Sequence, residues 1–106
     1  MLFLLRMDVV PQSPSLRTAD FDGLVKQELA RAAELFKDGT LVAIWRRPGK
    51  WSNWSLWRTQ DATELHTLLA DLPLWPYLRI DVEVLAEHPV LSLLGDDFDT
   101  RRNLFE

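Results

Sequence analysis

The spacing of apolar side chains switches repeatedly between two periods along this chain, and the order of the switches limits the fold more than any other feature. Apolar and polar residues alternate over 2–9, 41–57 and 77–84, as in strands, and a turn signal interrupts the middle stretch. Apolar residues recur at helical spacing over 21–36 and 61–72. The sequence therefore predicts the order β-α-β-β-α-β, a ferredoxin-like α+β fold with an antiparallel sheet and both helices on one face.

Capping and breaking residues mark the ends of the two expected helices. Thr18 or Asp20 can cap the start of the first helix, and Gly39 supplies its stop signal. Residues 61–64, which read Asp-Ala-Thr-Glu, resemble a capping box at the start of the second helix. Pro73 ends that helix because its ring cannot continue the hydrogen-bond ladder.

The middle stretch of alternation predicts a hairpin. Pro48 and Gly49 fit the two central positions of a type II turn. A β-bulge would shift the pairing by one residue and move every side chain of one strand to the other face. Without a bulge, one face carries Val42, Ile44, Arg46, Trp51, Asn53, Ser55 and Trp57. We therefore expect polar and aromatic groups to line one wall.

Composition excludes several classes of function. The 12 Lys and Arg against 16 Asp and Glu give a net charge of −4, so we expect no nucleic-acid partner. The chain has no cysteine, which excludes disulfides and thiolate metal sites. His66 and His88 lack a partner at ligand spacing, so we expect no metal. No phosphate loop, dinucleotide motif or apolar stretch of membrane-spanning length is present, so we expect no cofactor, no membrane and a cytoplasmic location.

Glu28 is the most informative polar residue. It lies four residues after Leu24 and four before Ala32, so helical geometry places a carboxylate within the apolar stripe. Burial disfavours the charged form and would raise its pKa toward the range of a proton carrier. The alternative is a boundary position, where the carboxylate is solvated or paired with Lys26 or Arg31.

Two arginines and two polar residues are candidates for ligand binding. Arg6 and Arg46 each interrupt an expected strand, and an inward guanidinium needs an anion, which a protein or a substrate carboxylate can supply. Asn53 and Ser55 share a strand face and are candidate donors to a developing oxyanion. Surface salt bridges and ordinary exposed strand positions are the alternatives.

The aromatic residues and His66 allow two interpretations. The tryptophans at 45, 51, 54, 57 and 75 suit the wall of a site for a flat ligand, but such residues also form cores and subunit interfaces. His66 is either a helix residue at the core edge or an acid–base group. A free sheet face exposing Leu2, Leu4 or Trp54 would favour self-association.

Several short motifs together resemble the muconolactone delta-isomerases. They are Met1–Val9, Ile44-Trp-Arg46 with Gly49, Asn53-Trp-Ser55, Glu64–Leu69, Leu72–Tyr77 and His88-Pro89. The resemblance spans a domain of residues 1–90. Residues 91–106 form a C-terminal tail, for which we expect packing on a neighbouring subunit.

The resemblance implies a subunit of the dimeric α+β barrel type in a large homo-oligomer, typically a decamer. It implies a cofactor-independent proton shift from muconolactone to 3-oxoadipate enol-lactone in the catabolism of aromatic compounds, and related members dehalogenate chlorinated lactones. A glutamate of the family aligns with Glu28, which is then the catalytic residue. The candidate substrate-binding residues are Arg6, Arg46, Trp51, Asn53, Ser55 and His66.

This chain departs from the family pattern at four positions. Val25 and Leu29 stand where members often carry basic residues, Trp51 replaces a common tyrosine, and Leu4 replaces a histidine. These changes imply a more apolar pocket. Two other functions stay open from sequence: a cofactor-less oxygenase or cyclase acting on an aromatic or polyketide substrate, and a non-catalytic module that binds a small ligand.

Overall fold

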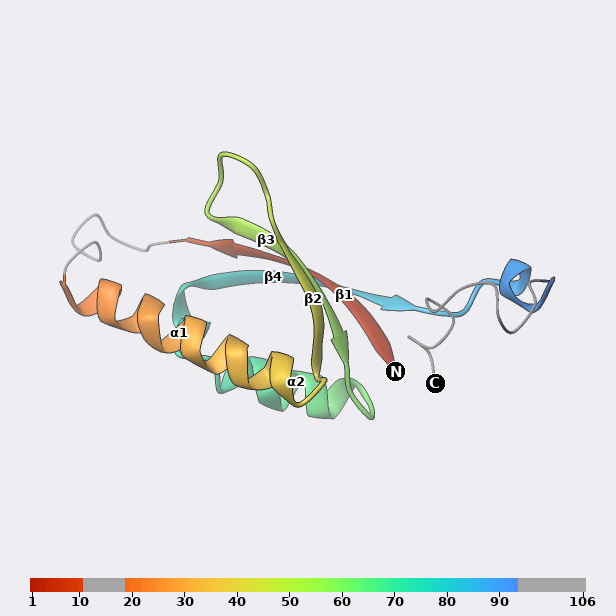
Figure 1. Cartoon of the computed structure of the whole chain (residues 1–106). Coiled ribbons are helices and arrows are strands. Elements are labelled where there is room, and N and C mark those ends of the chain that lie inside the picture. The colour runs from red at the N-terminus through yellow and green to blue at the C-terminus, as the bar shows by residue number, and fades with distance from the viewer. Residues whose placement is uncertain (11–18, 94–106) are drawn as a thin grey trace.

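The structure, a computed structural model, describes residues 1–10 and 19–93. The elements confirm the predicted order β-α-β-β-α-β (Figure 1). They are β1 (Leu2–Val9), α1 (Ala19–Lys37), β2 (Leu41–Arg46), β3 (Ser52–Arg58), α2 (Ala62–Ala70), the 3₁₀ turn η2 (Trp75–Tyr77), β4 (Leu78–Leu85) and the 3₁₀ turn η3 (Pro89–Leu93). No helix among these residues is long and apolar enough to cross a membrane.

The four strands form one sheet in the order β2-β3-β1-β4, and every neighbouring pair is antiparallel. Both helices lie on the same face of this sheet (Figure 1). The fold is therefore ferredoxin-like, as the sequence predicts. We call the face under the helices the inner face and the opposite one the outer face.

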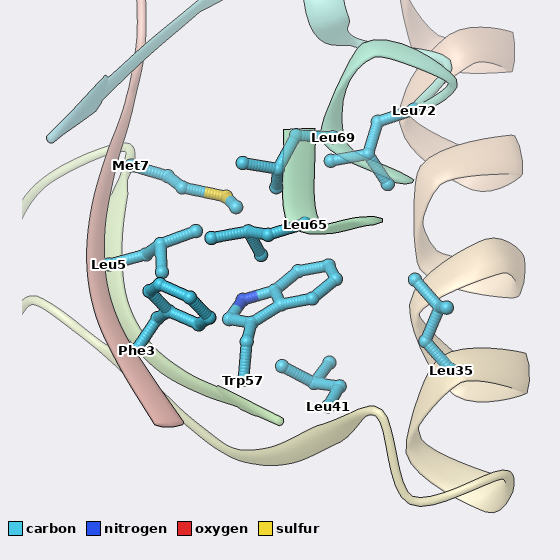
Figure 2. Packing of buried hydrophobic residues seen from close by; sticks show 9 residues of the cluster. All are labelled: Phe3, Leu5, Met7, Leu35, Leu41, Trp57, Leu65, Leu69 and Leu72. Carbon is cyan, nitrogen blue, oxygen red and sulfur yellow. The ribbon is translucent and has the colours of Figure 1, made fainter. Parts of the chain in front are cut away.

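The core lies between the inner face and the helices. Strand alternation on β1 turns Phe3, Leu5 and Met7 inward, and all three are buried. They pack with buried residues of both helices and of β2 and β3, with Trp57 in their midst (Figure 2). The cluster consists of Phe3, Leu5, Met7, Leu35, Leu41, Trp57, Leu65, Leu69 and Leu72.

The hairpin between β2 and β3 contains the predicted turn, and its strand pairing shows which side chains share a face. Gly49 has a φ of 73°, and the Lys50 N–H donates to the Arg47 carbonyl, which fits the predicted type II turn. Arg46 pairs with Asn53, so these two residues share the inner face. A register shift between Leu41 and Ala43 places Leu41, and not Val42, opposite Trp57. Of the two alternatives, the hairpin therefore contains the bulge, and the inward position that Val42 would take without one does not occur, because an extra residue interrupts the ladder there.

The helix ends follow the expected chemistry where they are described. Gly39, which follows α1, has a φ of 87°, and its N–H donates to the Phe36 carbonyl in the last turn of that helix. Asp61 caps α2, because its carboxylate accepts the Glu64 N–H at 2.8 Å. Asp20 lies inside the first turn of α1 and does not precede it. The expected cap Thr18 lies outside the described residues, as does the tail from 94 onward.

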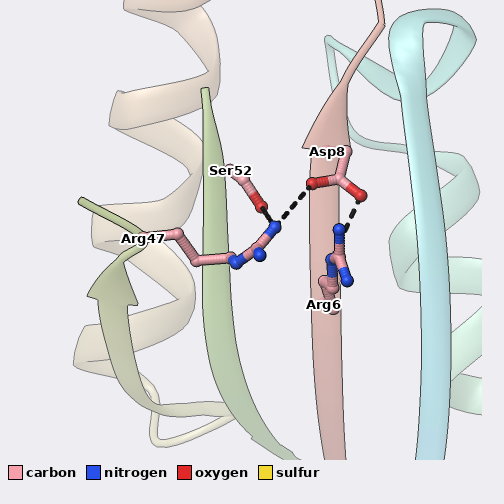
Figure 3. A network of polar contacts seen from close by, with 4 residues as sticks. All are labelled: Arg6, Asp8, Arg47 and Ser52. Carbon is pink, nitrogen blue, oxygen red and sulfur yellow. Dashed lines mark hydrogen bonds and ion pairs between the residues drawn. The ribbon is translucent and has the colours of Figure 1, made fainter. Parts of the chain in front are cut away.

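The outer face carries a polar network beside large apolar side chains. Asp8 lies 3.3 Å from Arg6 and 3.4 Å from Arg47, and Arg47 also bonds the Ser52 hydroxyl (Figure 3). The Ser52 hydroxyl and the nearby arginines lower the pKa of Asp8. Of the three residues considered for an exposed sheet face, Leu2 is buried, whereas Trp54 is 38% exposed.

Candidate active site

A cavity of about 310 Å³ lies between the inner face of the sheet and α1. This volume is at the lower end of the range for small-ligand sites. Apolar side chains from β1, α1, β2 and β3 form most of the wall, together with Leu72 after α2. Four polar or charged residues complete the lining: Glu28, Arg46, Asn53 and Ser55.

Glu28 reaches the cavity from the middle of α1. Its side chain is half-buried, and its Oε2 atom accepts a hydrogen bond from the main-chain N–H of Leu74 at 3.2 Å. Burial raises the pKa of Glu28, and the Leu74 hydrogen bond opposes that rise. Arg31 pairs with Glu34 at 2.9 Å, and no ion pair to Glu28 exists among the described residues. The carboxyl group therefore lies half-buried in the lining of the cavity, without the ion pair to Arg31 that was one alternative.

One side of the cavity is the inner face of β3, where Asn53, Ser55 and Trp57 alternate with outward residues. The Trp57 indole N–H donates to the Ser55 hydroxyl oxygen at 2.9 Å, and Ser55 is fully buried. The Asn53 Oδ1 atom is also buried, but it has no hydrogen-bond partner within the described part of the chain. An unpaired buried polar atom costs about 1–3 kcal/mol, so a ligand that pairs with this amide recovers that loss.

Arg46, the last residue of β2, brings a positive charge to the same cavity. Its Cα partner in the neighbouring strand is Asn53, and both residues line the cavity from the inner face. The side chain is exposed, and among the described residues it forms no ion pair. It is therefore available to an anionic group of a ligand.

Three sequence candidates do not line this cavity. Arg6 is on the outer face, because its neighbours Leu5 and Met7 point inward, and its Nε atom lies 3.3 Å from Asp8. Trp51 stacks on Phe21 with ring centroids 5.7 Å apart.

His66 is the third of these residues. It is exposed on α2, and its ring meets the edge of Trp75 at a centroid distance of 5.8 Å. No group of three His, Asp or Glu side chains suited to a metal ion occurs in residues 1–10 and 19–93.

Sequence reasoning missed the Leu74 amide and the part played by Trp57. The segment Leu72-Pro-Leu-Trp-Pro76 indicates a stiff turn, because two prolines restrict its backbone. Nothing in the sequence shows which N–H of that turn meets Glu28, since the contact joins residues 46 positions apart. The bond from Trp57 to Ser55 could have been anticipated, because side chains two apart on a strand share a face.

Known proteins resemble this chain over most of its length. The family model of muconolactone delta-isomerase matches residues 1–90. The muconolactone delta-isomerase of Cupriavidus pinatubonensis is 40% identical over 90 residues, covering 84% of this chain and 96% of that protein. The enzyme of the same name from Acinetobacter baylyi is 41% identical over 98 residues, covering 92% and 98%.

Solved structures agree with these sequence matches. The crystal structure of a muconolactone isomerase superposes with a TM-score of 0.79 at 32% identity, covering 93% of this chain and all of that one. A 5-chloro-2-hydroxyhydroquinone dehydrochlorinase from Burkholderia phenoliruptrix has a TM-score of 0.62 at 17% identity, which shows a shared fold only. The family match, the identities and the structural agreement lead to one conclusion: this chain belongs to the muconolactone delta-isomerase family.

Proposed function

We propose that this protein is a cofactor-independent isomerase that converts muconolactone, or a close analogue, to the corresponding enol-lactone in the catabolism of aromatic compounds. The observation that carries the proposal is the half-buried Glu28 carboxyl group in a cavity of small-ligand size. The names of the relatives point to the same reaction. Neither an oxygenase or cyclase nor a non-catalytic binding module is favoured by these relatives.

The reaction moves one proton between two carbons of an unsaturated lactone. Glu28 takes the proton from the carbon next to the ring oxygen, and the electron pair spreads through the double bond onto the lactone carbonyl. The same carboxyl group then returns a proton to the carbon two positions away, which leaves the double bond shifted. A positioned base of this kind contributes on the order of 10²–10⁴-fold to the rate. Its raised pKa suits both halves of the exchange.

The polar side of the cavity supports the intermediate. Negative charge gathers on the lactone oxygen, where a donor already in position lowers the barrier by roughly 3–4 kcal/mol. Asn53 is the better candidate donor, because its side chain is only partly buried and no hydrogen bond to Oδ1 holds the amide in its present orientation. Rotation of the amide presents its NH₂ group to an acceptor. Ser55 is fully buried, and its hydroxyl oxygen already accepts a hydrogen bond from the Trp57 N–H. Its contribution to binding is therefore to shape this wall of the cavity.

Arg46 is the proposed anchor for the carboxylate of the ligand. Among the described residues that line the cavity, it is the only charged one besides Glu28. Arg6 has no such role, since it faces the other side of the sheet. Val25 and Leu29 add apolar surface to the lining, which favours a ligand with an apolar edge beside its carboxylate.

We further propose that the subunits assemble through the outer face into dimers and then into a larger homo-oligomer. Trp45 and Trp54 are partners across β2 and β3 and stay 54% and 38% exposed. Arg6 and Asp8 add both signs of charge to this face. A two-fold interface brings a surface against itself, and a face carrying apolar groups and both charges is self-complementary.

The substitution Glu28→Gln tests the proposed reaction. It keeps the size of the side chain but cannot accept the proton, so turnover of muconolactone, followed by absorbance in the presence of a chelator, should fall at least 10²-fold. Glu34→Gln is the matched control, because it makes the same change on an exposed residue of α1. Circular dichroism should show both variants folded. A Glu28→Gln protein that works at the original rate would refute the proposal.

A further inference from the structure

The Glu28 carboxyl group is held at one oxygen and open at the other. Oε2 accepts the N–H of Leu74 at 3.2 Å. Oε1 accepts no hydrogen bond from the described residues, and it is not one of the buried atoms left without a partner, so it is accessible. The two oxygens of one catalytic group therefore have different environments.

The donor belongs to a stiff segment. Leu74 is 5% exposed and lies in the connection between α2 and β4. Turn hydrogen bonds fix the backbone on both sides of it, from the Trp75 N–H to the Leu72 carbonyl at 2.9 Å and from the Tyr77 N–H to the Leu74 carbonyl at 2.7 Å. Pro73 directly before Leu74 further limits the backbone. An N–H held in this way is a fixed point against which a side chain can be aligned.

We propose that the main-chain N–H of Leu74 is a positioning group, which holds Oε2 of Glu28 and leaves Oε1 as the oxygen that removes and returns the proton. The inference rests on the proposed role of Glu28. A carboxylate that serves two carbons of one ring must stay directed at that ring through both transfers, and small errors in such geometry are costly. One oxygen tied to a rigid turn restricts rotation about the last bond of the side chain.

The same contact adjusts the charge of the base. A donated N–H favours the carboxylate over the neutral acid, so it limits the rise in pKa that burial causes. In the described part of the cavity lining, Arg46 on β2 is the one other charged group, while on α1 the Arg31 charge is engaged by Glu34. The cavity residues of β1 and β3 and the segment 72–77 carry no charge. Among the described residues, the Leu74 N–H is therefore the one group that lowers the pKa of Glu28, and its loss leaves the effect of burial unopposed.

The test replaces Leu74 by its α-hydroxy analogue, which turns one amide into an ester. The side chain stays, the N–H is lost, and the Pro73 carbonyl becomes a weaker acceptor. Since catalysis needs the carboxylate, the acidic limb of the profile of kcat/KM against pH should move to higher pH by about one to two units, as expected for one lost hydrogen bond to a charged group. The maximal kcat should also fall, because Oε2 is no longer held.

The same replacement at Trp75 is the matched control. It removes a hydrogen bond within the same turn, to the Leu72 carbonyl, without touching Glu28. The Trp75 ester should therefore show the acidic limb of kcat/KM at the same pH as the unmodified protein, even if it unfolds at a lower temperature. If the two esters give the same limb and the same kcat, the positioning role is overturned.

A second measurement needs no turnover and no modified backbone. The NMR shift of the Leu74 amide proton should titrate together with the Glu28 carboxyl group, and the titration should vanish in Glu28→Gln. An amide shift that does not follow Glu28 overturns the inference. If muconolactone is not converted at all, the proposed function fails, and this titration still decides whether Leu74 holds Glu28.

Discussion

Glu28 is subject to two opposing influences. Burial between α1 and the sheet favours the neutral acid, and the Leu74 N–H favours the carboxylate, with burial the larger effect on its pKa. A group whose pKa is raised by folding is protonated more readily in the native state than in the unfolded chain. The feature that suits Glu28 to proton transfer therefore costs stability wherever the group is ionised.

This cost predicts a dependence of stability on pH. Because the native pKa lies above the usual 4.5, the folded state binds more protons in the interval between the two values, and the free energy of unfolding falls as the pH rises through it. The free energy of unfolding of the wild type minus that of Glu28→Gln should therefore decrease from about pH 4 upward and then become constant.

Urea denaturation at a series of pH values and one protein concentration measures that difference. Glu34→Gln is again the control, since Glu34 is exposed on the same helix. A wild type that gains stability relative to Glu28→Gln as the pH rises through this interval would contradict the description of Glu28.

At the scale of elements, strand alternation decides which arginine serves the cavity. The side chains of β1 and β2 alternate between faces, and the pairing of Arg46 with Asn53 places Arg46 inside, while Arg6 lies outside beside Asp8. Arg46→Ala should therefore raise the KM for muconolactone by roughly tenfold or more, the loss expected for a hydrogen-bonded charge, and change kcat much less.

Arg6→Ala provides the comparison, because it removes the same charge from the opposite face. Steady-state kinetics should give it a KM close to that of the wild type. A larger KM effect at Arg6 than at Arg46 would mean that the strand faces have been assigned the wrong way round.

Periodicity carried most of the information about the elements. The order of strands and helices, the turn at Gly49 and the cap at Asp61 each follow from residues close together in sequence. The bulge near Val42 does not, because it depends on how two strands fit each other across the hairpin.

The candidate site was predictable to the same extent. Helical spacing indicated Glu28, and the strand face indicated Asn53 and Ser55, all of which line the cavity. Arg6 and Arg46 could not be told apart until the inward face of each strand was known, and the Leu74 contact depends on the tertiary packing of two distant segments.

For the whole molecule, exposed apolar side chains indicate a missing partner. Trp45 and Trp54 are exposed together on the outer face, and Val82 and Val84 are exposed together on the inner face near the end of β4, although their strand partners Leu5 and Phe3 are buried. Single exposed apolar residues are ordinary, but groups of them on one surface are typical of interfaces. We therefore expect the isolated chain to be the unit of an assembly.

Trp54→Glu tests the proposed interface. The new carboxylate would be buried in any contact between two outer faces, which is costly without a partner, so the molar mass from light scattering should fall. Trp75→Glu makes the same exchange beside His66 of α2 and should keep the original mass. An unchanged mass for Trp54→Glu in a folded protein would place the interface elsewhere.

The proposed reaction depends on a carboxyl group at the position of Glu28, and chemical rescue shows whether that group transfers the proton. Glu28→Ala removes the carboxyl group and opens space in the cavity for a small carboxylic acid. We predict that this variant is inactive on muconolactone alone and regains turnover, in a saturable manner, when acetate or formate is added but not when chloride is added. Turnover by Glu28→Ala at the wild-type rate without added acetate would contradict this role of Glu28.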